Sequence, residues 1–360
     1  MVKAGLRQDT KVWRMSPGSR LVAKMISACK RADVLLILLV LLLGGLLLLR
    51  YGSMPEPVSM QSVPSPALQP SAQETPAPAR QKLPVAGSPV RFLMYNVQNY
   101  FVVGEKSRSR YMNRAKSRKS REAVAEVIAA GQPDIVGLIE IGGEKALEDL
   151  RGLLAKHGLE YAHAVLVARE GEDRALALLS RFPIVRNDSR ADFPLYGRRQ
   201  RKMLRGVLDA TVQLEDGRMF RIVGAHLKSR MGDDAAAAAA LRASEAASLA
   251  FYLHERMLSM PEMPFLVFGD WNDGPDDASL RLLRHGIAEH SALTRLLPRD
   301  SRGEEWTLFY KNARAYYVFD QIFVNSVTRK RRGSRSGCGI VDVPAAGDAS
   351  DHRALWCELR

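Results

Sequence analysis

From Val90 to the C-terminus, short apolar segments alternate with stretches of helical periodicity, and this alternation constrains the fold more than any other feature. The apolar segments predict strands at Val90–Tyr95, Asp134–Ile139, Ala175–Leu179, Arg205–Val212, Phe220–Ala225, Phe265–Phe268, Gln321–Val324 and Arg353–Leu359. Helices are expected at Ser117–Ala130, Gly143–His157 and about Asp233–Met257. The pattern therefore predicts an α/β or α+β domain, residues 90–360, with a substantial sheet.

Most of these strands end or begin at a polar residue. Carboxylate, amide or imidazole side chains follow four of them: Asn96, Glu140, His226, and Asp270 with Asn272. Two later strands are instead preceded by such residues: Asp320, and Asp351 with His352. If the two later strands run antiparallel to the others, all these side chains gather along one edge of a mixed sheet. One such residue is more typical of a turn, but the whole set predicts a single active site.

The residue types in this set indicate a particular chemistry. Carboxylate and amide oxygens favour Mg²⁺ or Mn²⁺ over zinc. Such a cation neutralises charge that develops on a phosphate group, and a carboxylate beside an imidazole helps that imidazole to deprotonate water. The set therefore favours hydrolysis of a phosphodiester or a phosphomonoester.

The order of these motifs resembles the endonuclease/exonuclease/phosphatase superfamily, the group of deoxyribonuclease I and the exonuclease III-type repair enzymes. The resemblance rests on Asn96, Glu140, Ser180-Arg181, His226, Gly269-Asp270-Trp271-Asn272, Asp320 and Ser350-Asp351-His352. It covers residues 90–360 and implies a four-layer α/β/β/α sandwich with two mixed β-sheets. Ile139 stands where the repair nucleases carry a Gln before the metal-binding Glu, and this departure removes no ligand.

The resemblance also implies roles for individual residues. Glu140 would be the principal metal ligand, with Asn96 beside it and Asp351 completing the surroundings of Mg²⁺ or Mn²⁺. The phosphate would contact Asn272, Arg181 and His226.

The catalytic roles follow from the same resemblance. Asp270 would orient or deprotonate the attacking water, while Asp320 and His352 would form a carboxylate–imidazole pair. His226 would also protonate the leaving group. Whether Asp270 or His352 is the base stays open at this point.

An uncharged apolar run, Val34–Leu49, precedes the domain. Residues 1–33 carry a net charge of +6, and residues 53–89 are rich in Pro, Ser and Ala. These features predict a basic cytoplasmic segment (1–33), a transmembrane anchor (34–52) and a disordered linker (53–89), with the catalytic domain outside the cytoplasm. A cleaved signal peptide, which would give a secreted protein, and a buried core helix are the alternatives.

Charge indicates the class of partner. The chain has a net charge of +14, and three basic segments lie in the domain, at residues 106–121, 198–205 and 329–335. A basic domain favours anionic partners. A nuclease is therefore the preferred function, and a sphingomyelinase-like or inositol-phosphate phosphoesterase and a non-catalytic binding module are the alternatives. No obligate protein partner is indicated, and Cys338 and Cys357 are candidates for a disulfide if the domain is exported.

Overall fold

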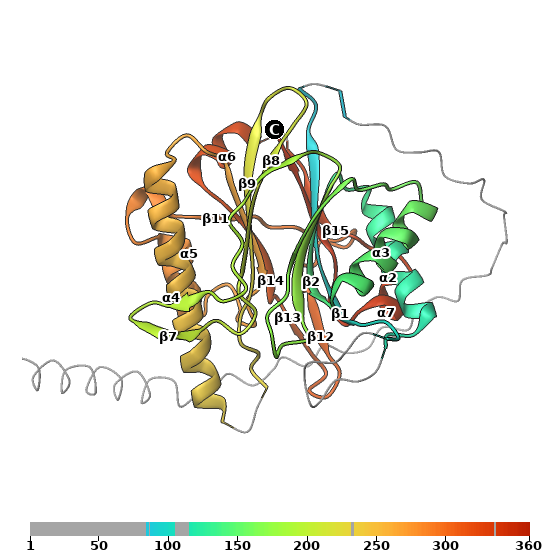
Figure 1. Cartoon of the computed structure of the whole chain (residues 1–360), viewed down its shortest axis with the longest axis horizontal. Helices are drawn as coiled ribbons and strands as arrows, with labels where there is room; N and C mark the ends of the chain where they lie inside the picture. The colour runs from blue at the N-terminus through green and yellow to red at the C-terminus, as the bar shows by residue number, and fades with distance from the viewer. Residues whose placement is uncertain (1–83, 86, 105–114, 232–233, 335) are drawn as a thin grey trace, which may run out of the picture. The chain divides into compact units, whose positions relative to one another are not determined.

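The computed structural model of the protein describes residues 84–85, 87–104, 115–231, 234–334 and 336–360. The predicted segments 1–33 and 34–52, and the linker up to residue 83, lie outside these ranges. Within the described part, no helix is long and apolar enough to cross a lipid bilayer. Figure 1 shows two β-sheets packed face to face, with helices on the outer side of each, which agrees with the expected α/β sandwich.

The first sheet has six strands in the order β15-β16-β1-β2-β4-β3. β1 is parallel to β2, whereas β16 and β4 are antiparallel to their neighbours, so the sheet is mixed. The bounds are β1 Val90–Tyr100, β2 Ile135–Ile141, β3 His163–Val167, β4 Ala175–Ser180, β15 Cys338–Ile340 and β16 Leu355–Leu359. Its outer face is covered by α2 Arg118–Gly131, α3 Glu144–Lys156 and α7 Ala346–Ala349.

The second sheet also has six strands, in the order β11-β14-β10-β9-β8-β5. The bounds are β5 Ile184–Asn187, β8 Val207–Gln213, β9 Met219–His226, β10 Phe265–Asp270, β11 Thr294–Arg295 and β14 Asp320–Val324. The outer helices are α4 Ala235–Ser259 and α5 Arg281–His285. Beside them lie the short helices η1 Ala278–Leu280 and η2 Glu289–Ser291, while α6 Ser326–Arg332 follows β14 and packs near β10, β14 and β16. Two hairpins complete the domain, β6 Pro194–Leu195 with β7 Arg198–Lys202, and β12 Leu308–Tyr310 with β13 Ala315–Tyr317.

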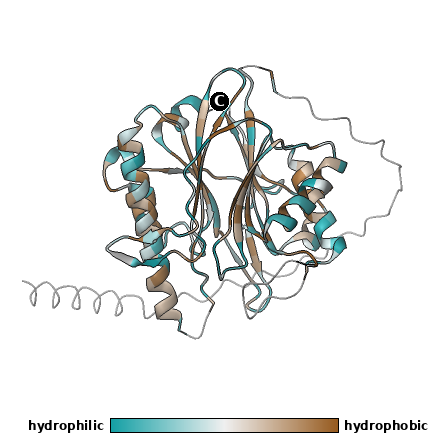
Figure 2. Cartoon of the chain, viewed as in Figure 1, coloured by the Kyte–Doolittle hydropathy of each residue, from teal (hydrophilic) through white to brown (hydrophobic). Residues whose placement is uncertain are grey.

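The space between the sheets is a hydrophobic core. Figure 2 shows hydrophobic residues along the central strands and hydrophilic residues prominent on the outer helices. At its centre, the ring of Phe268 packs on Phe92 of the facing sheet, with 5.3 Å between the ring centroids. Gly137 and Gly224 leave room for this ring, because a Cβ atom at either position would lie 2.5 Å from Phe268 Cζ. The close approach of the two sheets thus depends on glycine at both positions.

All eight predicted strands and all three predicted helices are present, with boundaries that differ by a few residues. The long helix α4 begins at an N-cap, Asp234, whose side chain accepts a hydrogen bond from Ala237 N at 2.8 Å.

The cysteines Cys338 and Cys357 face each other in the β15–β16 register, and both are free thiols. The disulfide left open by the sequence is therefore not formed in this structure.

Candidate active site

Three neighbouring strands of the second sheet bring three of the predicted residues together. Asp270 ends β10, where it is in register with His226 of the parallel strand β9 and with Asp320 of the antiparallel strand β14. All three side chains are buried. The antiparallel direction of β14, which the sequence analysis required, is therefore confirmed.

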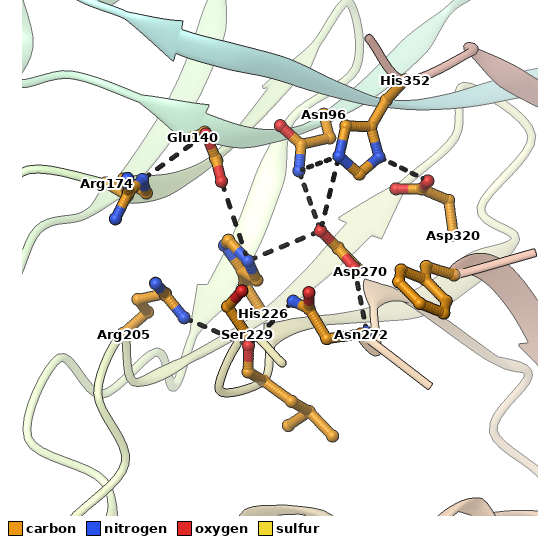
Figure 3. Close-up of polar contacts among 12 residues, drawn as sticks. Asn96, Glu140, Arg174, Arg205, His226, Ser229, Asp270, Asn272, Asp320 and His352 are labelled. Carbon is orange, nitrogen blue, oxygen red and sulfur yellow. Dashed lines mark hydrogen bonds and ion pairs between the residues drawn. The ribbon is translucent and has the colours of Figure 1, made fainter. Parts of the chain in front are cut away.

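The first sheet supplies the facing residues (Figure 3). Asn96 lies near the end of β1, Glu140 lies near the end of β2, and His352 precedes β16, which is antiparallel to β1. The strand register shifts beside Asn96 and Glu140, and such irregularities redirect side chains. Glu140 has φ +64° and Asn272 has φ +52°, a conformation that side-chain-bearing residues rarely adopt and that is frequent at functional sites.

Asp320 and His352 form the expected pair. Their atoms Oδ2 and Nδ1 are 2.7 Å apart, and both residues are buried. Burial alone would lower the pKa of His352, but the adjacent Asp320 carboxylate outweighs it and raises the pKa to about 10. His352 is therefore a cation at neutral pH in this arrangement.

Asp270 is the centre of the cluster. Its Oδ2 accepts a hydrogen bond from Asn96 Nδ2 at 2.9 Å and lies 3.5 Å from His226 Nε2 and 3.9 Å from His352 Nε2. Its Oδ1 accepts from the backbone N of Asn272 at 3.0 Å. Burial, and after it the nearby Asp320 carboxylate, raises the pKa of Asp270 to about 7.

The amide of Asn96 is oriented as a donor toward this cluster. Its Nδ2 faces Asp270 and lies 3.4 Å from His352 Nε2, while its Oδ1 accepts from the backbone N of Gln98 at 3.0 Å. The side chain thus orients Asp270, and its part in binding a metal stays a prediction.

Glu140 lies on the other side of His226. Its Oε1 is 3.8 Å from His226 Nε2, and its Oε2 accepts from the backbone N of Asn99 at 3.0 Å and lies 3.5 Å from Arg174 Nε. Burial, together with the positive charges of Arg205 and Arg174, lowers the pKa of His226 well below its usual value. His226 is therefore neutral and is able to donate one hydrogen bond.

The donor set fits a divalent cation. Asp270, Asp320 and His352 offer ligand atoms that all lie within 4.8 Å of one another. Asp320 Oδ1 and Asp351 Oδ1 are buried oxygens with no hydrogen-bond partner among the described residues. Burial, and the negative charge of Glu140 nearby, raise the pKa of Asp351. Crowded carboxylates with unused oxygens are the surroundings that a hard cation stabilises.

Asn272 is placed beside a buried arginine. Asn272 Nδ2 and Arg205 Nη1 both donate to the backbone oxygen of Leu227, each at 3.1 Å. Arg205 is only 5% exposed, and its Nε has no hydrogen-bond partner in the described part of the chain. This corner of the site presents amide and guanidinium groups of the kind that hold phosphate oxygens.

Arg181 lies elsewhere. It follows β4, which is antiparallel to β2, so Arg181 lies at the end of the sheet opposite to Glu140. There its Nη1 is 2.6 Å from Asp134 Oδ1, and both side chains are 6% exposed. The prediction that Arg181 contacts phosphate is therefore wrong for this site, because its guanidinium serves a buried ion pair.

Comparison with known proteins agrees with this geometry. A model of the endonuclease/exonuclease/phosphatase family matches residues 95–352. The chain belongs to the endonuclease/exonuclease/phosphatase family. No curated protein sequence matches the chain. The enzymes of this family hydrolyse phosphate esters, and they typically depend on a divalent metal ion, so the chain is placed in that general class.

Solved structures of the endonuclease/exonuclease/phosphatase family share the fold. The catalytic domain of human Nocturnin with bound sulfate is 19% identical, with a TM-score of 0.52 over 76% of this chain and 94% of that chain. Sphingomyelinase C from Streptomyces griseocarneus is 19% identical, with a TM-score of 0.53 over 76% and 100% of the two chains. Truncated Caenorhabditis elegans TDP2 is 14% identical, with a TM-score of 0.51 over 76% and 98%. At identities of 14–19%, the likeness shows the fold alone.

The sequence analysis assigned no role to some residues of this endonuclease/exonuclease/phosphatase site. Thr307 Oγ1 accepts from the backbone N of Asp320 at 3.0 Å, and Ser350 Oγ donates to the backbone O of Asn96 at 2.8 Å. Thr307 carries no sequence signal, whereas Ser350 stands within the Ser350-Asp351-His352 motif. Arg174 likewise precedes β4 without a motif, so only the folded chain reveals that it lies beside Glu140.

Proposed function

We propose that this protein hydrolyses phosphodiester bonds of nucleic acid by metal-assisted attack of water. The observation that supports the proposal most directly is the convergence of Glu140, Asp270, Asp320 and His352 from both sheets on one buried cluster. Asp270, Asp320 and His352 lie together, and His226 connects them to Glu140. Neither hydrophobic packing nor turn formation explains such a chain of ionisable side chains inside a domain.

The charge states of the cluster suggest a division of roles. Asp270, with a pKa of about 7, is the better acceptor for a proton from water, because His352, with a pKa of about 10, is already protonated at neutral pH. His352 would then stabilise negative charge on the phosphate. Neutral His226 would donate a hydrogen bond to a phosphate oxygen, with Asn272 as a second donor.

The residues that suit the cation are Glu140 and Asp351, because a protonated His352 has no free lone pair to offer a metal in the group that it forms with Asp270 and Asp320. When bound there, Mg²⁺ or Mn²⁺ would neutralise charge on the phosphate and on the leaving oxygen. This choice of ligands and of metal follows from the donor chemistry, in which hard oxygen atoms predominate.

The distribution of basic residues favours a polyanionic substrate. Lys116, from the first basic segment, donates from Nζ to the backbone O of Gln98 at 3.1 Å, close to the site. Arg205, from the second segment, borders Asn272. Residues 329–332 of the third segment are on α6, which follows the far end of β14 and so lies away from the site. Residues 105–114, which hold much of the first segment, lie outside the described residues.

A panel of substrates tests this proposal. Plasmid DNA, RNA, sphingomyelin and inositol phosphates are incubated with the purified protein, with Mg²⁺ or Mn²⁺ and with EDTA. We expect nucleic-acid hydrolysis that EDTA abolishes and that Glu140→Ala, Asp270→Ala or His352→Ala each reduce by at least about 100-fold. The control is Glu126→Ala, which removes an exposed carboxylate from α2. Wild-type turnover in all three site variants would refute the assignment.

A lipid phosphoesterase is the second candidate. The observation in its favour is the apolar run Val34–Leu49, because a membrane-tethered enzyme meets lipid headgroups continually. Hydrolysis of sphingomyelin without cleavage of DNA or RNA in the same panel would establish this alternative.

We also propose that residues 34–52 anchor the protein and that the domain works outside the cytoplasm. The positive charge before the apolar run supports this orientation. The test is a fusion of residues 1–90 to a reporter enzyme that is active only outside the cytoplasm. We expect this reporter to be active. The proposal would be overturned if, at the same position, only a reporter that works inside the cytoplasm were active.

A further inference from the structure

We propose that the segment from Trp306 to Phe319, which forms the β12–β13 hairpin, binds the nucleotides next to the scissile phosphate as a single strand. This inference rests on the proposed nuclease function and names a surface that the catalytic cluster does not include. Figure 1 shows the hairpin projecting from one end of the two packed sheets.

The hairpin is attached directly to catalytic residues. The backbone N of Phe309 donates to the backbone O of Asp351 at 3.1 Å, and Leu308 forms a β-bridge with His352. Thr307, at its base, accepts hydrogen bonds from the backbone N of Phe319 and of Asp320. A group bound along the hairpin therefore lies beside the site where the phosphate is expected.

Aromatic rings dominate this segment. Six of its fourteen residues are aromatic: Trp306, Phe309, Tyr310, Tyr316, Tyr317 and Phe319. Tyr316 is 59% exposed, and its ring centroid lies 4.8 Å from the ring centroids of both Trp306 and Phe309. An exposed ring that its neighbours hold in place is a suitable platform for a base, because stacking needs a planar partner with little freedom to lose.

The charge of the hairpin complements a phosphate backbone. Lys311 and Arg314, at the tip, are exposed, and the segment from Trp306 to Phe319 contains no acidic residue. Neither side chain has an ion-pair partner among the residues that the structure describes. Cations placed beside stacking rings are the combination that binds single-stranded nucleic acid without sequence preference.

The same features disfavour insertion into a lipid bilayer. The tip reads Lys311-Asn312-Ala313-Arg314 and holds no bulky apolar side chain. Tyr316 is the only large hydrophobic residue of the hairpin that is strongly exposed, and it lies on the stem. A membrane-inserting hairpin would place its apolar residues at the tip.

Binding of a labelled oligonucleotide tests the proposal. Fluorescence anisotropy of a short fluorescein-labelled oligothymidylate is recorded with the full chain in EDTA, so that no hydrolysis occurs. Tyr316→Ala should raise the Kd at least about fivefold, whereas Tyr316→Phe, which keeps the ring, should restore wild-type binding. If the hydroxyl made the contact, Tyr316→Phe would bind as weakly as Tyr316→Ala. An unchanged Kd in Tyr316→Ala would overturn the proposal, and circular dichroism and urea unfolding of each variant show whether a raised Kd comes from loss of structure instead.

A charge-matched pair of variants tests the tip. The double substitution Lys311→Ala with Arg314→Ala should reduce the slope of log Kd against log salt concentration by about 1.4, because two phosphate contacts on a single strand are lost. The control, Arg329→Ala with Lys330→Ala, removes the same charge from α6 and should leave the slope unchanged. Equal effects of the two double variants would overturn the proposal.

Two further measurements separate the possible failures. In the first, vesicles of phosphatidylcholine and phosphatidylglycerol replace the oligothymidylate. If the hairpin substitutions weaken binding to the vesicles but not to the oligonucleotide, the hairpin binds a lipid surface and the proposal is overturned. Wild-type hydrolysis of bis(p-nitrophenyl) phosphate reports on catalysis alone. If that activity is present, and wild type still cleaves nucleic acid while Tyr316→Ala binds oligothymidylate normally, the hairpin proposal fails and the proposed function stands.

Discussion

At the scale of single residues, the decisive feature is the charge that neighbouring groups impose on His352. Asp320 and His352 are in direct contact, and this contact overcomes the effect of burial on the imidazole. In the metal-free protein, Asp320→Asn should therefore lower the pKa of His352 from about 10. The pH titration of the imidazole signals by NMR measures this shift, and the same substitution should lower turnover by at least about 100-fold. An unchanged titration would show that Asp320 does not control the imidazole.

Arg181 shows how a residue within a family-like motif serves stability instead. Replacing it by Leu leaves the buried Asp134 carboxylate without its guanidinium partner, which should cost about 3 kcal/mol of the free energy of unfolding. Urea unfolding measures this loss. Turnover per folded molecule should stay within about twofold of wild type, as expected for a side chain at the far end of the sheet. A large loss of turnover with normal stability would return Arg181 to the active site.

At the scale of elements, the approach of the two sheets depends on two glycines. Gly137→Ala would place a methyl group 2.5 Å from Phe268 Cζ, and should destabilise the fold by about 1–3 kcal/mol through overpacking. Gly152→Ala is the matched control, since Gly152 lies in α3 with nothing within 4 Å of the added Cβ atom. It should stabilise the protein by about 0.5–1 kcal/mol through helix propensity. Chemical denaturation measures both changes in the free energy of unfolding. Changes of the same sign in the two variants would contradict this account.

The elements themselves were largely predictable from the sequence. Asp134–Ile139 and Phe265–Phe268 are apolar runs of strand length, and their local pattern indicates their structure without any distant contact. Short strands such as β3, β11 and β15 were missed. β3 is only partly buried, β11 has two residues and β15 has three. Each of these strands therefore depends on a neighbouring strand for its conformation.

At the scale of the whole molecule, a bound cation should couple the two halves of the site. Glu140 comes from one sheet and Asp270 from the other, and the negative charge of Glu140 contributes to raising the pKa of Asp270. A cation bound at Glu140 and Asp351 would therefore relieve repulsion across the two sheets. Saturating Mg²⁺ or Mn²⁺ should therefore raise the Tm, with about 2.7 kcal/mol of stabilisation expected at a concentration of 100 times the Kd. Glu140→Ala should abolish most of this increase, whereas Glu126→Ala should preserve it. Equal increases in both variants, measured by scanning calorimetry, would show that the ion binds elsewhere.

The sequence by itself determined which segments are strands and helices, and which carboxylates, amides and imidazoles are available for chemistry, because periodicity and residue type are local properties. Only the tertiary structure decided which ends of the strands meet. Asp320 joins Asp270 because β14 runs antiparallel to β10, while Arg181 is carried away from Glu140 because β4 runs antiparallel to β2. The direction of a strand depends on hydrogen bonds to residues far along the chain, and those pairings leave no mark in the local pattern.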